Sequence, residues 1–345
     1  MIRIPAGIFN NRLTDIMTQE RNTDIEEVLF EVEQRPIYFD SKEKSQANLF
    51  DGNSQLHFTR IPDFTAITNV QNDYVFSVVK PSYKLVTNRE AVELGKKYFA
   101  KVFGGIGKDD LEVFNVTYPK TKSFCHIDFI HESSDFEPWE NDKWTPFLRV
   151  TNSYNRTKLL RFDFGFCRWI CENGMIFGEK GITLKYAHTR NALPKASVFD
   201  TDLKELKEIE KDFVEKLHNL QRYHVPEKFM LPLVCRTFQI KVKKEDLERP
   251  KRLLQLSELK THINELTKQY FNDIGPNGYA ALNVLTDFAS RPAIYISPES
   301  MVDNFQKRTG KWTEEFIKEI KNDEFRFENY LSEYLETAGL ISRIN

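Results

Sequence analysis

Basic and aromatic side chains alternate along one segment of the sequence, from Arg149 to Lys195. The segment holds nine basic and three acidic residues, a net charge of +6, whereas the rest of the chain carries −8. Cationic side chains neutralise phosphates, and aromatic rings stack on bases with about 1–3 kcal/mol per base. The pattern therefore predicts a site for a polyanion, most specifically a single-stranded nucleic acid. The predicted binding residues are Tyr154, Arg156, Lys158, Arg161, Arg168, Lys185, Tyr186, His188 and Arg190.

The alternative for this segment is a solvated sheet face whose arginines pair with acids from the helices. Neighbours in sequence need not share a surface, so the charge excess alone leaves both interpretations open. The two cations that favour the binding interpretation most are Arg161, expected to face outward, and Arg156, expected at a hairpin tip.

Two histidines and an aspartate are the candidates for acid–base or metal chemistry. His126 and Asp128 fall on one face of an expected strand, and with His188 and a divalent metal they would suit an enzyme acting on nucleic acid or nucleotides. A polar strand face explains the same spacing. Structural zinc usually requires closely spaced cysteine pairs, and the chain has none, so Cys167 and Cys171 are expected to be packed thiols. We therefore predict no catalytic residue, metal or cofactor.

Composition limits the remaining function classes. The chain has 345 residues, 40% of them hydrophobic and 29% charged, with a pI near 6.4, which is typical of a globular protein without a strong overall field. The run Gly104–Lys108 resembles a phosphate loop, but no Ser or Thr follows the lysine and the run ends a helix. With four cysteines and neither a secretory signal nor a membrane-length apolar run, we expect a cytoplasmic protein without a membrane partner.

The elements that position the basic segment are expected to be antiparallel strands. Residues 147–154 and 158–167 form a predicted hairpin joined by Asn155–Thr157, with alternating apolar residues facing the core. This apolar face comprises Leu160, Phe162, Phe164 and Phe166. Residues 167–177 are predicted as a short packed helix or buried turn, and residues 182–188 as a third strand.

The whole chain is predicted to be α+β, with an antiparallel, hairpin-rich sheet in the N-terminal half and a mainly helical C-terminal half. Strands are expected at 64–70, 74–79, 111–118 and 122–130, and a helix capped by Asn88 at 88–103. Further helices are expected at 201–219, 244–270, 279–288 and 313–338. The predicted organisation is an arm (1–24), a core with the basic hairpin (25–195), a helical part of the same domain (196–300) and C-terminal amphipathic helices (301–345).

Five short stretches together resemble a known family. They are PSYKLVTNREA at 81–91, VTNSYNRT at 150–157, RWICENGM at 168–175, His188–Thr189 and PNGYAALNVLTDFAS at 276–290. Their order is similar to that of the phage/plasmid-like proteins of the domain-of-unknown-function family DUF932, over roughly residues 25–290. The family's hairpin typically carries Asp-Gly after its Asn-Ser-aromatic, whereas Asn155-Arg156 stands here and adds a cation at the tip.

The resemblance implies a protein carried by mobile elements, with a biochemical role that the family does not settle. Some members have a gene setting like that of single-strand annealing proteins, whose folds pair a hairpin-rich sheet with a helix. We therefore expect a non-enzymatic protein that binds single-stranded nucleic acid in replication, recombination or counter-defence. The alternatives are a metal-dependent enzyme acting on nucleic acid or nucleotides, and a homo-oligomeric interaction protein that docks through its tail, residues 313–338.

Overall fold

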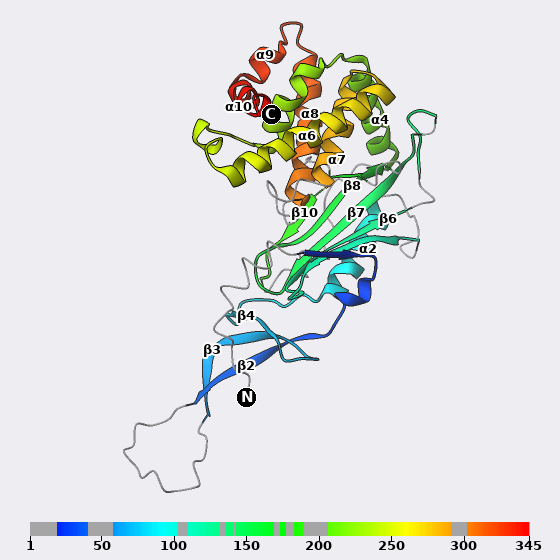
Figure 1. The fold of residues 1–345 in the computed structure, drawn as a ribbon. Coiled ribbons are helices and arrows are strands. Elements are labelled where there is room, and N and C mark those ends of the chain that lie inside the picture. Colours follow the sequence, from blue (N-terminus) through cyan, green and yellow to red (C-terminus); the bar gives the residue numbers. More distant parts are fainter. Residues whose placement is uncertain are drawn as a thin grey trace.

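An antiparallel sheet occupies the middle of the molecule, with a helical half at one end and a smaller sheet at the other (Figure 1). The computed structural model describes residues 19–40, 58–102, 110–131, 135–140, 142–168, 173–176, 183–189, 206–290 and 302–344. Strands dominate the first half and helices the second, so the predicted α+β class is confirmed.

The central sheet has the strand order β1-β5-β6-β7-β8-β10, with β9 also paired to β8. Every pairing is antiparallel, and the predicted hairpin is β7–β8, with Leu148 opposite Phe164. The strands are β1 (Gln19–Asn22), β5 (Glu112–Pro119), β6 (Phe124–Ile130), β7 (Trp144–Ser153), β8 (Leu160–Arg168), β9 (Asn173–Ile176) and β10 (Thr183–Tyr186).

Two predictions about this sheet were wrong. Part of the segment predicted as a helix or turn at 167–177 is the strand β9, which pairs with β8, because a short apolar run does not distinguish a buried strand from a helix. The predicted N-terminal arm also contains an ordered edge strand, β1, where the Asn22 amide donates to the Tyr118 hydroxyl at 2.8 Å.

One face of the sheet is apolar and carries two helices. Leu160, Phe162, Phe164 and Phe166 are each at most 1% exposed, as their alternation predicts. Helix α2 (Asn88–Val102) lies so close to this face that a Cβ on Gly95 would stand 2.6 Å from Val150 Cγ2. Helix α4 (Leu206–Arg222) packs Phe213 edge-on against Trp144, with ring centroids 5.0 Å apart.

Thr87, and not Asn88, caps helix α2. Thr87 and Glu90 form a reciprocal capping box, in which the Glu90 carboxylate accepts from Thr87 N at 2.8 Å and Thr87 Oγ1 accepts from Glu90 N at 3.2 Å. Asn88 is buried instead, with its side-chain oxygen accepting from the Asn152 amide of β7 at 2.8 Å. The two asparagines therefore fix the start of α2 against the hairpin.

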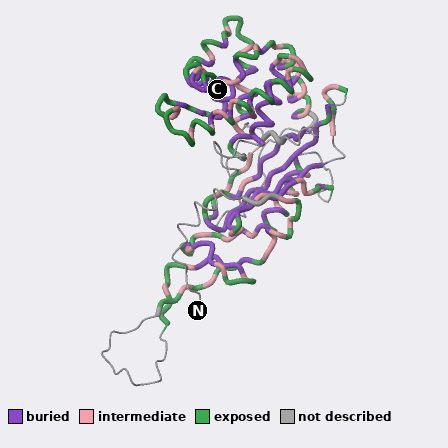
Figure 2. The backbone as a smooth tube through the Cα atoms, in the orientation of Figure 1, coloured by how far each residue is buried: buried purple, intermediate pink, exposed green. Residues whose placement is uncertain are grey.

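The helical half is built around α7, in which every residue is buried (Figure 2). Its elements are α4, α5 (Met230–Phe238), α6 (Pro250–Ile274), α7 (Gly278–Ser290), α8 (Val302–Ile320), α9 (Phe327–Tyr330) and α10 (Ser332–Ser342), with 3-10 turns at Glu227–Phe229 and Lys244–Asp246. Phe316, Phe327 and Ile341 from the tail are all buried in the same core. Most of the apolar stripe expected to dock a partner is thus covered by the chain itself, although Leu335 is 37% exposed.

The smaller sheet joins β2 (Val32–Asp40), β3 (Phe58–Asn69) and β4 (Val75–Val79), after a 3-10 turn at Ile25–Glu27. It projects from the far end of the central sheet (Figure 1). Tyr38, Phe39 and Phe58 are exposed where β2 ends and β3 begins. Within the described ranges, no helix combines the length and apolar character needed to cross a membrane.

Candidate nucleic-acid interface

Arg149, on the polar face of the central sheet, is held by a carboxylate. Asp128 stands directly opposite it on β6, and its two oxygens accept from Arg149 Nε and Nη2 at 2.6 and 2.7 Å. Arg149 Nη1 also donates to Gln306 of α8 at 2.7 Å. Arg149 is only 3% exposed. Asp128 therefore neutralises the charge of Arg149 inside the protein, and the bond to Gln306 joins the sheet to the helical half.

Arg161 and Arg168, both predicted to bind phosphates, are held in the same way. Arg161 Nε donates to Asp163 at 2.6 Å, and Lys307 of α8 approaches the same oxygen at 3.3 Å. Arg168 is 6% exposed, pairs with Asp142 at 2.5 Å and donates to Asn283 of α7 at 2.7 Å. Arg168 therefore links the sheet to α7, and Arg161 is neutralised by an aspartate of its own strand, so both offer less charge to a phosphate than the sequence pattern suggested.

Neither predicted tyrosine offers an open ring. Tyr154 is fully buried, and its hydroxyl accepts from the backbone N–H of Asn88 at 2.9 Å. It continues the buried alternation of Val150 and Asn152, which explains why it points into the core. Tyr186 is half-buried and packs edge-on against Phe162 at 6.3 Å. Stacking of a base on Tyr154 is excluded by this burial.

The hairpin tip, by contrast, presents its cation to solvent. Arg156 is exposed, has a φ of 64°, and forms no ion pair with any residue in the described ranges. The loop around it is fixed by Asn155, whose Oδ1 accepts from Thr157 N at 3.1 Å and whose amide donates to Ser123 Oγ at 2.8 Å. Lys158 is half-buried, with its ammonium 5.4 Å from the Phe124 ring centroid. A rigid loop therefore holds Arg156 outward.

A stacked pair of rings lies beside the tip. Tyr83 and His188 are nearly parallel, with centroids 5.2 Å apart and an interplanar angle of 10°. The Tyr83 hydroxyl donates to the Ser153 carbonyl at 3.3 Å, and Lys84 N donates to the His188 carbonyl at 3.2 Å. Three family-like stretches, 81–91, 150–157 and 188–189, therefore meet at one place.

The electrostatics of this pair follow from its burial. Burial raises the pKa of Tyr83, and the positive charge of nearby Arg156 opposes part of that rise. Burial also lowers the pKa of His188 below its ordinary 6.5, which favours a neutral imidazole at neutral pH.

Two exposed lysines lie near these rings in the sequence: Lys84 follows Tyr83, and Lys185 lies on β10 opposite Arg161 of β8. Lys84 and Lys185 are both exposed, and neither forms an ion pair within the described part of the chain. We call the group Lys84, Arg156, Lys158, Lys185, Tyr83 and His188 the tip surface. Of the other predicted or neighbouring basic and aromatic residues, Arg190, Lys180, Lys195 and Trp169 lie outside the described residues.

The acid–base candidates are not assembled into one centre. His126 Nδ1 lies 2.9 Å from the Thr151 hydroxyl, Asp128 is bound by Arg149, and His188 stacks on Tyr83. Burial raises the pKa of the Cys125 thiol to about 12, so it stays protonated. Across the residues that the structure describes, no three His, Cys, Asp or Glu side chains are grouped to hold a metal. Cys171 and the Gly104–Lys108 run lie outside those residues.

Sequence reasoning missed Tyr83 and Lys84, which precede the helix start in the stretch 81–91. It also missed the aspartates that neutralise the arginines, although one signal was available. Asp163 lies two positions after Arg161 on the same strand, and therefore on the same face. The aspartates lie on β6, on β8 itself and in the turn before β7, and not on the helices.

Fold and site together define an α+β protein whose antiparallel sheet is joined to a helical half by hydrogen bonds from two buried arginines to Gln306 and Asn283, with a cationic hairpin tip exposed to solvent. The chain belongs to the family described as domain of unknown function DUF932, whose model matches residues 75–312. That range contains the whole tip surface and α7. No curated protein and no solved structure matches the chain.

Proposed function

We propose that this protein binds single-stranded nucleic acid through the tip surface and does so without catalysing a reaction on it. The observation that carries the proposal is the exposed, unpaired guanidinium of Arg156, which a rigid loop holds beside the Tyr83–His188 stack. Because the loop backbone is fixed, less entropy is lost when Arg156 meets a phosphate than if the loop were mobile as well.

In this mechanism the cations follow the phosphates and the rings receive a base. Arg156, Lys84 and Lys185 neutralise backbone phosphates, and Lys158 adds a cation at the hairpin. Tyr83 is the more exposed ring of the stack, and a base extends the stack on it. Contacts of this kind carry little sequence information, so binding tolerates many sequences. We further propose that this binding serves the replication, recombination or counter-defence of a mobile element.

Fluorescence anisotropy with a labelled oligo-dT strand at low salt tests this function. We expect the protein to bind the strand, and the double variant Arg156→Glu, Lys158→Glu to bind it at least about tenfold more weakly, since each reversed cation now repels a phosphate. The matched control is Lys268→Glu, an exposed lysine on α6 in the helical half, which leaves binding unchanged. No binding by the unmodified protein, or an equal loss in the control, would overturn the proposal.

A further inference from the structure

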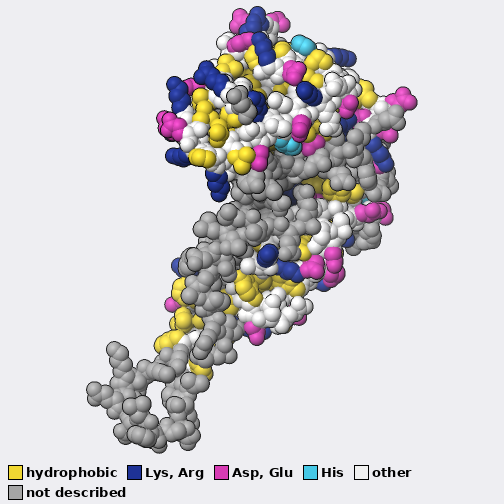
Figure 3. Space-filling view, in the orientation of Figure 1, with side chains coloured by type: hydrophobic (Ala, Val, Ile, Leu, Met, Phe, Trp, Pro, Cys, Tyr) yellow, Lys and Arg dark blue, Asp and Glu magenta, His cyan; other side chains and the backbone are white. Residues whose placement is uncertain are grey.

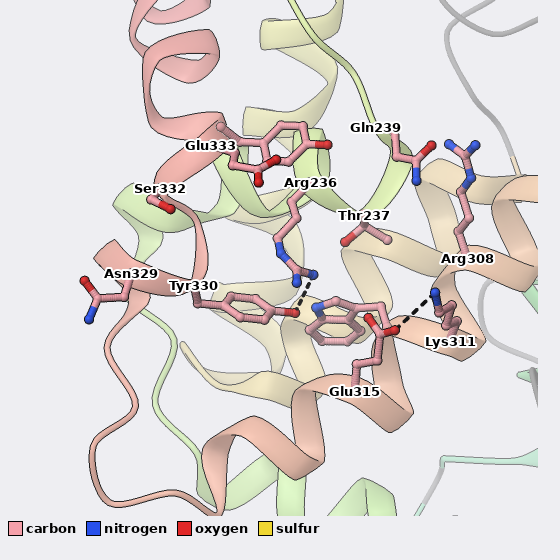
Figure 4. A pocket seen from close by; sticks show the side chains of 12 residues that line it. Arg236, Thr237, Gln239, Arg308, Lys311, Glu315, Asn329, Tyr330, Ser332 and Glu333 are labelled. Atoms are coloured by element: carbon pink, nitrogen blue, oxygen red, sulfur yellow. Dashed lines mark hydrogen bonds and ion pairs between the residues drawn. The ribbon is translucent and has the colours of Figure 1, made fainter.

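A pocket of about 460 Å³ opens in the helical half, between α5, α8, α9 and α10 (Figure 4). Its volume lies within the range of small-molecule sites. None of its lining residues belongs to the tip surface, so it is a separate feature of the molecule. The visible face of the helical half mixes cationic and anionic side chains without a field of one sign (Figure 3). Any ligand must therefore be recognised by the local chemistry of the pocket.

One end of the pocket gathers two cations from the same helix. Arg308 and Lys311 are three positions apart on α8, and hence on one face of it. Arg308 Nη1 donates to the Phe238 carbonyl at 2.5 Å, which fixes the guanidinium, and Arg308 forms no ion pair with any residue that the structure describes. Lys311 is exposed and lies 3.2 Å from Glu315. A fixed guanidinium next to an ammonium is suited to a phosphate group.

The other end combines a third cation with aromatic rings. The Arg236 guanidinium lies 3.9 Å above the Tyr330 ring centroid and donates to its hydroxyl at 2.9 Å. Burial raises the pKa of Tyr330 to about 12, so its hydroxyl stays neutral. Among the described residues, no carboxylate forms an ion pair with Arg236. Trp312 and Tyr334, both buried, complete this end. A planar guanidinium flanked by rings is a surface on which a heterocyclic base can stack.

Arg236 and Arg308 differ from the sheet arginines because neither has a carboxylate partner in the described part of the chain. Arg149 and Arg168 are bound by aspartates at 2.5–2.7 Å, as a partly desolvated guanidinium requires. Arg236 and Arg308 are half-buried, and each donates to a neutral acceptor, the Tyr330 hydroxyl and the Phe238 carbonyl respectively. An incoming phosphate would supply the missing charge at Arg308, and a planar ring could stack on the guanidinium of Arg236.

Polar groups for the edge of a base are also present. Gln239 ends α5 with a φ of 57°, a left-handed conformation that seldom carries a glutamine, and its amide borders the pocket. Figure 4 shows Arg236 and Arg308 on either side of Thr237, so the cationic ends are separated along the pocket. A ligand that satisfies both ends must be extended, with a charged group at one end and a planar group at the other.

We propose that this pocket binds a nucleoside monophosphate, with its phosphate at Arg308 and Lys311 and its base against Arg236. The planar base stacks on the guanidinium that already covers Tyr330, and Gln239 hydrogen-bonds its edge. This site is independent of nucleic-acid binding at the hairpin tip.

Isothermal titration calorimetry of the full chain with AMP, adenosine and inorganic phosphate tests the proposal. We expect AMP to bind at least about tenfold more tightly than either part alone, and Arg308→Gln and Arg236→Gln each to weaken AMP binding at least about tenfold. The matched control is Lys318→Gln, an exposed residue of α8 outside the pocket lining, which leaves the affinity unchanged.

Three results would overturn the nucleotide assignment: no AMP binding, phosphate binding as tight as AMP, or equal loss in the control. If the arginine variants unfold, the exposed Gln239→Ala variant provides the same test through weakened AMP binding with unchanged phosphate binding. The double variant Arg156→Glu, Lys158→Glu should bind AMP normally, which separates failure of this site from failure of the tip surface.

Discussion

At the scale of single residues, the arginines of the basic segment fall into two kinds. Arg149 and Arg168 are buried and each is bound by an aspartate, whereas Arg156 is exposed on a rigid loop. The difference follows from position: the first two lie on strands inside the packed sheet, and Arg156 lies between strands. A buried guanidinium without its carboxylate would be far less stable than one in water, so the pairing is a condition for folding.

Replacing one arginine of each kind separates structural from surface charge. We expect Arg149→Met to lower the free energy of unfolding by about 3–5 kcal/mol, because Asp128 is then left buried without its partner. The matched variant Arg156→Met should change it by less than about 0.5 kcal/mol. Urea unfolding monitored by circular dichroism measures both. Similar destabilisation by the two variants would contradict the distinction between a structural Arg149 and an exposed Arg156.

The burial of His188 makes stability depend on pH. Its folded-state pKa is lowered below 6.5, so the unfolded chain binds a proton more readily than the folded one. The neutral ring of His188 contributes fully to the free energy of unfolding above pH 6.5, and this contribution is lost as the pH falls below that value. In His188→Phe, which keeps the stack on Tyr83 but cannot be protonated, the fall in stability from pH 7.5 to 5.5 should be smaller. An identical pH profile would show that His188 is solvated.

At the scale of elements, α2 depends on its contact with the sheet. Gly95 lets the helix approach closely, and the paired amides of Asn88 and Asn152 fix its first turn against β7. Helix α2 therefore owes more of its stability to packing against the sheet than to the helix propensity of its residues. This matters for the tip surface, because the stretch 81–91 leads directly from Tyr83 into α2.

Two glycine-to-alanine substitutions test that dependence. Alanine is favoured over glycine in a helix by about 1 kcal/mol. At Gly95, however, the new methyl would stand 2.6 Å from Val150 Cγ2, so we expect Gly95→Ala to destabilise the protein by about 1–3 kcal/mol. At Gly339 of α10 nothing lies within 4 Å, and Gly339→Ala should be stabilising. Thermal unfolding measures both, and stabilisation by Gly95→Ala would contradict close docking.

Most strands and helices could be predicted from the sequence, whereas the residues of the candidate site could not. Alternation located the β7–β8 hairpin and its buried phenylalanine face, since period two is a local property. Pairing of Arg149 with Asp128 depends on the register between β6 and β7, and that of Arg168 with Asn283 on helix packing, neither of which is local. Tyr154 was predicted to stack on a base, although its position two and four residues after the buried Asn152 and Val150 indicated that it is buried as well.

At the scale of the whole molecule, polar side chains of the basic segment join the central sheet to the helical half. Arg149 contacts Gln306, Arg168 contacts Asn283, and Asp163 contacts Lys307, so three links cross from strands to α7 and α8. Three cations of the basic segment, Arg149, Arg161 and Arg168, are neutralised within the fold by Asp128, Asp163 and Asp142. We infer that what remains for a partner is concentrated at the tip surface, at the end of the sheet away from the helical half.

The most direct test of this division is the salt dependence of binding to single-stranded DNA. Each phosphate contact contributes a slope of about −0.7 to the logarithm of affinity against the logarithm of salt concentration. We predict that the double variant Arg156→Gln, Lys158→Gln flattens the slope by about 1.4, while Lys268→Gln leaves it unchanged. An unchanged slope in the double variant would contradict phosphate binding at the hairpin tip.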